Sequence, residues 1–118
     1  MTLPFAKYHG ARNDFVIVDG RPGAPGAPES GLDRPGLAVA MCDRHAGAGA
    51  DGLLVASEVT VPGAVAHMRM FNPDGSESEM CGNGLRCFAR WLAAAGELSP
   101  TSTDAVIQTG AGPLSVTL

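Results

Sequence analysis

The segment FNPDGSESEMCGNGLRCFARW, residues 71–91, passes from a polar turn into an apolar helical pattern, and we expect the fold to form around it. It opens with Asn72-Pro-Asp-Gly, a combination typical of a tight turn. From Gly84 onward, apolar residues recur at helical spacing in two stripes, which predicts a mostly buried helix over 84–95 that ends at Gly96. The stripes are Leu85, Phe88, Leu92 and Ala95, and Cys87, Trp91 and Ala94.

Cys81 lies before the first turn of this helix, between Met80 and Gly82. At the start of a helix, free backbone N–H groups and the positive end of the helix dipole stabilise a thiolate. Glycine lets a ligand approach the backbone closely, and backbone N–H groups there can bind a carboxylate. These features suggest a base or nucleophile that acts on a small anionic substrate. Spacing alone leaves a functional and a structural role open for Cys81.

The other two cysteines are predicted to be structural. Cys87 follows Cys81 by six residues, which corresponds to about 120° around a helix and roughly 9 Å along it, so the two cannot serve one substrate atom together. Cys42 lies among the apolar positions of a predicted helix over 34–45, where cysteine usually contributes packing. Three cysteines without a CxxC pair favour reduced thiols and give no sign of a zinc site or another metal site.

Length and charge limit the class of protein. A chain of 118 residues, 45% of them hydrophobic, is long enough for one domain with its own core, so we expect a single domain over 1–118. A net charge of -4 with eight Lys and Arg argues against nucleic acid as a partner. No apolar run reaches the ~18 residues of a membrane span, and the start of the chain lacks a signal-peptide core. We expect a cytoplasmic protein without a membrane partner.

The remaining elements are predicted from β-branched runs, alternation and turn residues. In the strand expected at 65–71, Ala66, Met68 and Met70 share one face, which we expect to face the core. The loop at 20–32 is rich in glycine and proline and is expected at the surface. The other strands are expected at 3–8, 14–19 and 53–59, with a closing hairpin of 106–109 and 113–118.

Two polar turns are further candidate sites. Asn13 follows the first strand, where its amide could bind a ligand or only cap the turn. The segment RHAGAGADG, residues 44–52, is glycine-rich, but it lacks GxGxxG and a Walker lysine, so a helix C-cap and tight turn explain it better than a phosphate loop. His45 in this segment is a minor candidate for a general base, because histidine at a helix end more often contacts the last carbonyls.

Four motifs span nearly the whole chain: HGARNDFVIVD at 9–19, RHAGAGADG at 44–52, FNPDGSE at 71–77 and CGNGLRCFAR at 81–90. Together they resemble the amino-terminal half of the diaminopimelate epimerase family, and they occur in the family's order. The resemblance implies a pyridoxal-independent epimerase without a cofactor that interconverts LL- and meso-diaminopimelate, a step toward lysine and peptidoglycan. It implies an α+β fold in which mostly antiparallel strands wrap around a central helix, here the one after Cys81.

The resemblance also implies roles for individual residues. Cys81 corresponds to one of two cysteines that take and give the α-proton from opposite faces of the substrate carbon. Gly82 and Asn83 correspond to residues that bind the α-carboxylate near the helix start, while Asn13 and Asn72 hold polar groups of the substrate. A thiolate suits this chemistry because the helix start stabilises both its charge and the charge that builds on the carboxylate.

The family's second half is absent from this chain. In the family it brings the partner cysteine and further residues that grip the substrate's ammonium and carboxylate groups, so we expect the 118 residues alone to be inactive. Assembly as a homodimer stays open. Two positions depart from the family's pattern: Arg12 stands where members usually carry glycine, and Gly52 where some members carry a glutamine near the substrate.

Two alternatives remain. A proline or hydroxyproline racemase belongs to the same superfamily, but its segment around the cysteine differs, and Asn83-Gly84 after Cys81-Gly82 favours the diaminopimelate enzymes. From another class, the chain could be a non-catalytic single-domain remnant. A downstream reading frame with a second cysteine at a glycine-rich helix start would distinguish a half of the enzyme from a remnant.

Overall fold

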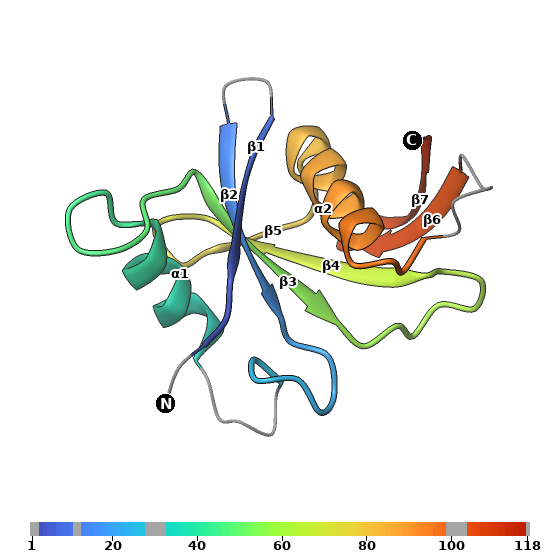
Figure 1. The fold of residues 1–118 in the computed structure, drawn as a ribbon, viewed down its shortest axis with the longest axis horizontal. Coiled ribbons are helices and arrows are strands. Elements are labelled where there is room, and N and C mark those ends of the chain that lie inside the picture. Colours follow the sequence, from blue (N-terminus) through green and yellow to red (C-terminus); the bar gives the residue numbers. More distant parts are fainter. Residues whose placement is uncertain (1–2, 11–12, 28–32, 99–103, 118) are drawn as a thin grey trace.

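The computed structural model describes residues 3–10, 13–27, 33–98 and 104–117. Within these ranges the chain forms seven strands and two helices (Figure 1). In chain order they are β1 (Ala6–Gly10), β2 (Asn13–Asp19), α1 (Arg34–Cys42), β3 (Gly52–Ser57), β4 (Ala66–Phe71), β5 (Glu77–Ser78), α2 (Gly82–Ala94), β6 (Asp104–Thr109) and β7 (Gly112–Thr117).

The strands form one mixed sheet. Its order is β1-β2-β3-β4-β6-β7, and β5 pairs with β4. The pairs β2–β3 and β4–β6 are parallel, whereas the other four are antiparallel. The α+β class and the predominance of antiparallel pairs agree with the expectation. The parallel pairs were not expected; they arise because α1 and α2 serve as the crossover connections that parallel neighbours require.

The two helices cover opposite faces of the sheet (Figure 1). Because both faces are covered, all six residues of β3 are buried. Leu54 and Ala56 belong to the core under α2, while Leu53 and Val55 belong to a second core under α1. The expected core face of β4 is confirmed, since Ala66, Met68 and Met70 are buried under α2.

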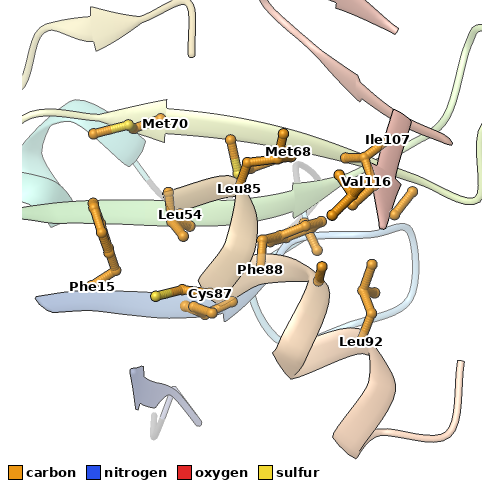
Figure 2. Packing of buried hydrophobic residues seen from close by; sticks show 14 residues of the cluster. Phe15, Leu54, Met68, Met70, Leu85, Cys87, Phe88, Leu92, Ile107 and Val116 are labelled. Atoms are coloured by element: carbon orange, nitrogen blue, oxygen red, sulfur yellow. The ribbon is translucent and has the colours of Figure 1, made fainter. Parts of the chain in front are cut away.

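Helix α2 buries one side against the curved sheet. Cys87 and Phe88 are 0% exposed, and Leu85 and Leu92 pack beside them against side chains of β2, β3, β4, β6 and β7 (Figure 2). The helix was expected to be mostly buried, but this holds for one side only. The residues on its other side are exposed: Arg86, Arg90, Ala93 and Ala94.

A groove of 630 Å³ follows this exposed side of α2. Tyr8 of β1 lines one wall and Val116 of β7 the other, so α2 lies between the first and last described strands (Figure 1). These two strands are the edges of the described sheet and do not pair with each other. The described strands therefore wrap around α2 only in part.

Several element boundaries differ from the predicted ones. Helix α1 ends at Cys42 instead of residue 45, because Asp43 is extended and its carboxylate accepts the backbone N–H groups of His45 and Ala46. Strand β1 begins at Ala6 instead of residue 3, since Pro4 has no N–H group to offer a neighbouring strand. Leu118, expected in the last strand, lies outside the described residues.

The surface loop expected after β2 contacts the C-terminal end of α2 through its first residues. Arg21 forms ion pairs with Asp19 and with Glu97, and its guanidinium lies 5.7 Å from the centroid of the Trp91 ring. Residues 28–32 of this loop lie outside the described part of the chain. Within that described part, neither helix combines the length and hydropathy needed to cross a membrane.

Candidate active site

Strand topology gathers the candidate residues at one end of the sheet. Asn13 begins β2, Asp51 directly precedes β3 and Asn72 directly follows β4. Because β2 and β3 are parallel while β3 and β4 are antiparallel, these three positions share one end. The register is fixed by the pairs Phe15↔Gly52 and Leu53↔Phe71.

Cys81 is the N-cap residue of α2, which confirms its predicted position at the helix start. Its backbone is extended, with φ -140° and ψ 124°, and its carbonyl accepts the first helical hydrogen bond from the Leu85 N–H at 2.8 Å. The side chain is half-buried and makes no capping hydrogen bond. The thiol therefore leaves the first-turn N–H groups, which lack partners inside a helix, to another acceptor.

Asn13 and Asn83 meet at this helix start although they are 70 residues apart. The Asn83 Nδ2 group donates a hydrogen bond of 2.7 Å to Asn13 Oδ1, and both side chains are half-buried. Asn83 is the second residue of α2 and follows Cys81 and Gly82. Four of the five predicted site residues thus lie together in one small region.

Asn72 is the fifth, and its side chain is held within its own turn. Its Nδ2 group donates to Ser76 Oγ at 3.0 Å, and its carbonyl accepts the Gly75 N–H at 2.9 Å. Gly75 has φ 90°, so the turn predicted at 72–75 is confirmed. The turn lies at the same end of the sheet as Asn13, but the Asn72 amide is bound to Ser76 and does not join the Asn13–Asn83 pair.

Close backbone approaches fix the surroundings of the helix start. A Cβ atom at Gly10 would lie 3.0 Å from Cys87 Sγ, so glycine lets β1 and β2 pack directly on α2. Arg90 of α2 donates to the His9 carbonyl at 3.0 Å and strengthens this contact. A Cβ atom at Gly110 would lie 2.8 Å from the Glu79 backbone, so the turn between β6 and β7 packs against the segment that leads to Cys81.

A charged cluster supports Asn13 from the side of β1 and β3. Asp51 Oδ2 accepts the backbone N–H of Asp14 at 2.9 Å and faces Asn13 Nδ2 at 3.5 Å. Arg44 Nη2 lies 3.1 Å from both Asp14 Oδ1 and Asp51 Oδ1, and Lys7 Nζ lies 3.4 Å from Asp14 Oδ2. The Arg44 guanidinium, hydrogen-bonded to Asp14, holds the pKa of that carboxyl well below its usual range.

The contacts of this cluster with Asn13 were not predicted from the sequence. Arg44 and Asp51 belong to the segment 44–52, which was interpreted only as a helix C-cap and tight turn. The turn itself is confirmed, since the N–H groups of Gly49 and Ala50 bind the carbonyls of Met41 and Cys42. The available signal was the pair of opposite charges that flanks the glycine-alanine run.

The other two cysteines are packing residues, as predicted. Cys87 of α2 is 0% exposed in one core, and Cys42 at the end of α1 is 4% exposed in the other. Burial raises the pKa of both thiols. His45 is exposed in the turn after α1, where its backbone N–H binds Asp43.

The two departures from the family's pattern have different outcomes. A Cβ atom at Gly52 would lie 3.2 Å from both the Phe15 ring and the Met70 methyl group, so a side chain here would require both to shift. Phe15 and Met70 thus fill the space that the first atoms of a side chain at position 52 would need. Arg12 lies outside the described residues. Among the described residues, no group of three His, Cys, Asp or Glu is placed to hold a metal ion.

Sequence comparisons point to one family. A family model described as diaminopimelate epimerase matches residues 5–118. The diaminopimelate epimerase of Synechococcus elongatus is 48% identical over 124 residues, covering 100% of this chain and 39% of the relative. Diaminopimelate epimerase 1 of Nostoc sp. is 45% identical over 118 residues, covering 98% of this chain and 39% of the relative. The chain therefore spans about two fifths of the length of these curated relatives.

Solved structures share the fold at low sequence identity. A probable proline racemase from Agrobacterium radiobacter matches with a TM-score of 0.72 and 17% identity, covering 99% of this chain and 38% of that chain. A methylitaconate-delta-isomerase matches with a TM-score of 0.74 and 12% identity, covering 98% of this chain and 34% of that chain. At such identities the likeness shows a common fold only.

Proposed function

Because the chain belongs to the diaminopimelate epimerase family, we propose that it forms the amino-terminal part of a pyridoxal-independent epimerase that interconverts LL- and meso-diaminopimelate. The observation that carries this proposal is the position of Cys81 as N-cap residue of α2, beside the joined amides of Asn13 and Asn83. In this proposal the enzyme acts in the cytoplasm, in the synthesis of lysine and peptidoglycan.

The reaction begins with proton removal by Cys81. Its thiolate takes the α-proton of the amino acid, and negative charge builds on the α-carbon and its carboxylate. The first-turn N–H groups of α2, at Gly82 and Asn83, bind that carboxylate, and the helix dipole stabilises the added charge. The Cys81 side chain makes no cap bond of its own, which supports this role because it does not compete for the N–H groups.

Asn13, Asn83 and Asn72 orient the substrate. Asn13 and Asn83 share one hydrogen bond at 2.7 Å, so each amide is held while its remaining donors or acceptors can bind the substrate. Asn72 would contribute from the neighbouring turn at the same end of the sheet, after its bond to Ser76 is exchanged for one to the ligand. Held amides bind more tightly than free ones because less side-chain entropy is lost.

Inversion requires an acid on the opposite face of the α-carbon. Cys42 and Cys87 are buried in two different cores and cannot reach a ligand at the start of α2. We therefore assign the second cysteine, and the groups that grip the substrate's ammonium group, to the part of the relatives that this chain does not span. Alone, the 118 residues do not epimerise diaminopimelate.

The two alternative functions have weaker support. The proline racemase and a hydroxyproline epimerase share the fold at 17% and 14% identity, whereas relatives of the proposed type reach 45% and 48% identity. A non-catalytic remnant does not account for a cysteine at a helix start whose side chain makes no capping hydrogen bond and which lies next to two hydrogen-bonded amides.

The test uses the chain alone and joined to the remaining part of the enzyme. Conversion of LL- to meso-diaminopimelate and uptake of solvent deuterium at the α-carbon are measured for both. We expect both activities only in the joined form, and we expect Cys81→Ser to abolish them while Cys42→Ser retains them. Epimerisation by the 118 residues alone, or full activity of Cys81→Ser in the joined form, would overturn the proposal.

A further inference from the structure

We propose that Asp51, clamped by Arg44, is a positioning residue that sets the direction of the Asn13 and Asn83 amides at the start of α2. The inference rests on the proposed function for its catalytic consequence, because Asn13 and Asn83 are the residues to which substrate binding is assigned there. Asp51 itself lies behind Asn13 and does not belong to the proposed substrate-binding set.

The Asp51 carboxylate is held in a fixed place. Its Oδ2 atom accepts the Asp14 backbone N–H at 2.9 Å, and its own backbone N–H binds the Asp14 carbonyl at 2.8 Å. Arg44 Nη2 holds Oδ1 at 3.1 Å and at the same time contacts Asp14. The carboxylate is thus tied to the residue that follows Asn13, and it cannot move away without breaking several bonds.

The carboxylate of Asp51 determines which atom of the Asn13 amide faces it. An ionised carboxylate only accepts hydrogen bonds, whereas an amide has one accepting and one donating end. The atom of Asn13 that faces Asp51 must therefore be Nδ2, and it lies 3.5 Å from Asp51 Oδ2. The Asn13 oxygen is then turned toward Asn83, where it accepts the bond from Asn83 Nδ2 at 2.7 Å.

The direction of the Asn13 amide in turn sets that of the Asn83 amide at the start of α2. With Asn13 Oδ1 fixed as acceptor, Asn83 must present its nitrogen to Asn13, and its oxygen is left for another partner. Asp51 thus determines which end of each amide the substrate meets. An amide at position 51 could donate as well as accept, so both asparagines could turn over and the fixed direction would be lost.

The test compares Asp51→Asn with Glu97→Gln in the ¹⁵N-labelled chain. Both changes neutralise one carboxylate that pairs with an arginine, but Glu97 pairs with Arg21 beyond the other end of α2. In Asp51→Asn we expect the side-chain amide signals of Asn13 and Asn83 to shift and their protons to exchange with water about 2- to 12-fold faster, as expected for loss of one hydrogen bond. In Glu97→Gln both signals should keep their positions and rates.

Unchanged Asn13 and Asn83 amide signals in a folded Asp51→Asn protein would overturn the inference. If this variant does not fold, Arg44→Gln decides, because Arg44 is exposed and its loss removes the ion pair to Asp51 Oδ1 while the two bonds to Asp14 stay. Faster exchange of the Asn13 and Asn83 side-chain protons with water in Arg44→Gln supports the proposal, and unchanged exchange rates refute it. These signals are read without substrate, so the positioning role and the proposed epimerase function can fail independently.

With the proposed activity as readout, the joined form of the enzyme should show a matching change. Asp51→Asn should raise KM for diaminopimelate about 2- to 12-fold with a smaller effect on kcat, because the amides bind ground state and transition state alike. A loss confined to kcat, with KM unchanged, would contradict a positioning role exerted through Asn13 and Asn83.

Discussion

The different burial of the three cysteines predicts a large difference in their reactivity. Cys81 is half-buried at the start of α2, whereas Cys87 is 0% and Cys42 is 4% exposed. A buried thiol reacts only when the protein opens. For a domain with an unfolding free energy of about 5 kcal/mol, the open fraction is roughly 1 in 5,000. We therefore expect Cys81 to react with iodoacetamide at least about 10³-fold faster than the other two.

The assay is alkylation of the native chain at neutral pH, followed by mass spectrometry of the peptides that contain each cysteine. A Cys81→Ala variant should lose the fast reaction. A Cys42→Ala variant should keep it, and denaturant should make all remaining thiols react alike. If Cys87 in the native chain reacted within about tenfold of Cys81, the packing of α2 against the sheet would be much looser than its burial indicates.

Two further predictions concern stability. Gly10→Ala places a methyl group 3.0 Å from Cys87 Sγ. We expect it to lower the free energy of unfolding, measured in urea, by about 1–3 kcal/mol. Cys87→Ala should relieve part of this loss, and strictly additive effects in the double variant would argue against the contact. Burial raises the pKa of Cys42 and Cys87 above the ordinary thiol value of 9.0, so above about pH 9 the unfolded chain loses thiol protons that the folded chain keeps. The contribution of these thiols to stability should therefore fall as pH rises above about 9 and stay constant between pH 7 and 8. In thermal unfolding, Cys42→Ala and Cys87→Ala should show a weaker loss of stability at alkaline pH than the parent chain. An unchanged loss would contradict the raised pKa of these thiols.

Much of the local structure was predictable because it depends on neighbours in the sequence. The helical stripes and glycines of 81–96 predicted a helix over 84–95 with Cys81 before its first turn, and the observed helix α2 spans Gly82–Ala94. Proline and glycine predicted the turn at 72–75, and alternation predicted the methionine face of β4. Helix α1 was predicted three residues too long, because the Asp43 side chain binds the following backbone and ends the helix.

The pairing of distant segments was not predictable from these local signals. No local pattern indicated that β2 pairs with β3 in parallel, and this pairing places Asn13 beside Asp51. Nor was it predicted that the exposed side of α2 extends to Ala93 and Ala94, since apolar alanines resemble core positions. Alanine is compatible with either environment, so its burial depends on whether another element covers it.

By itself, the sequence determined the chemical identity of the site: a cysteine before a helix, glycines that open its first turn, and asparagines that can bind a polar substrate. Only the tertiary structure decided which of these groups act together. In it, Asn13 and Asn83 form a hydrogen bond although they are 70 residues apart, and the Asn72 amide binds Ser76. Asp51 contacts Asn13 and forms an ion pair with Arg44. The physical reason is that helix periodicity and turn chemistry act over a few residues, whereas these contacts depend on sheet register and on how α2 packs across the sheet.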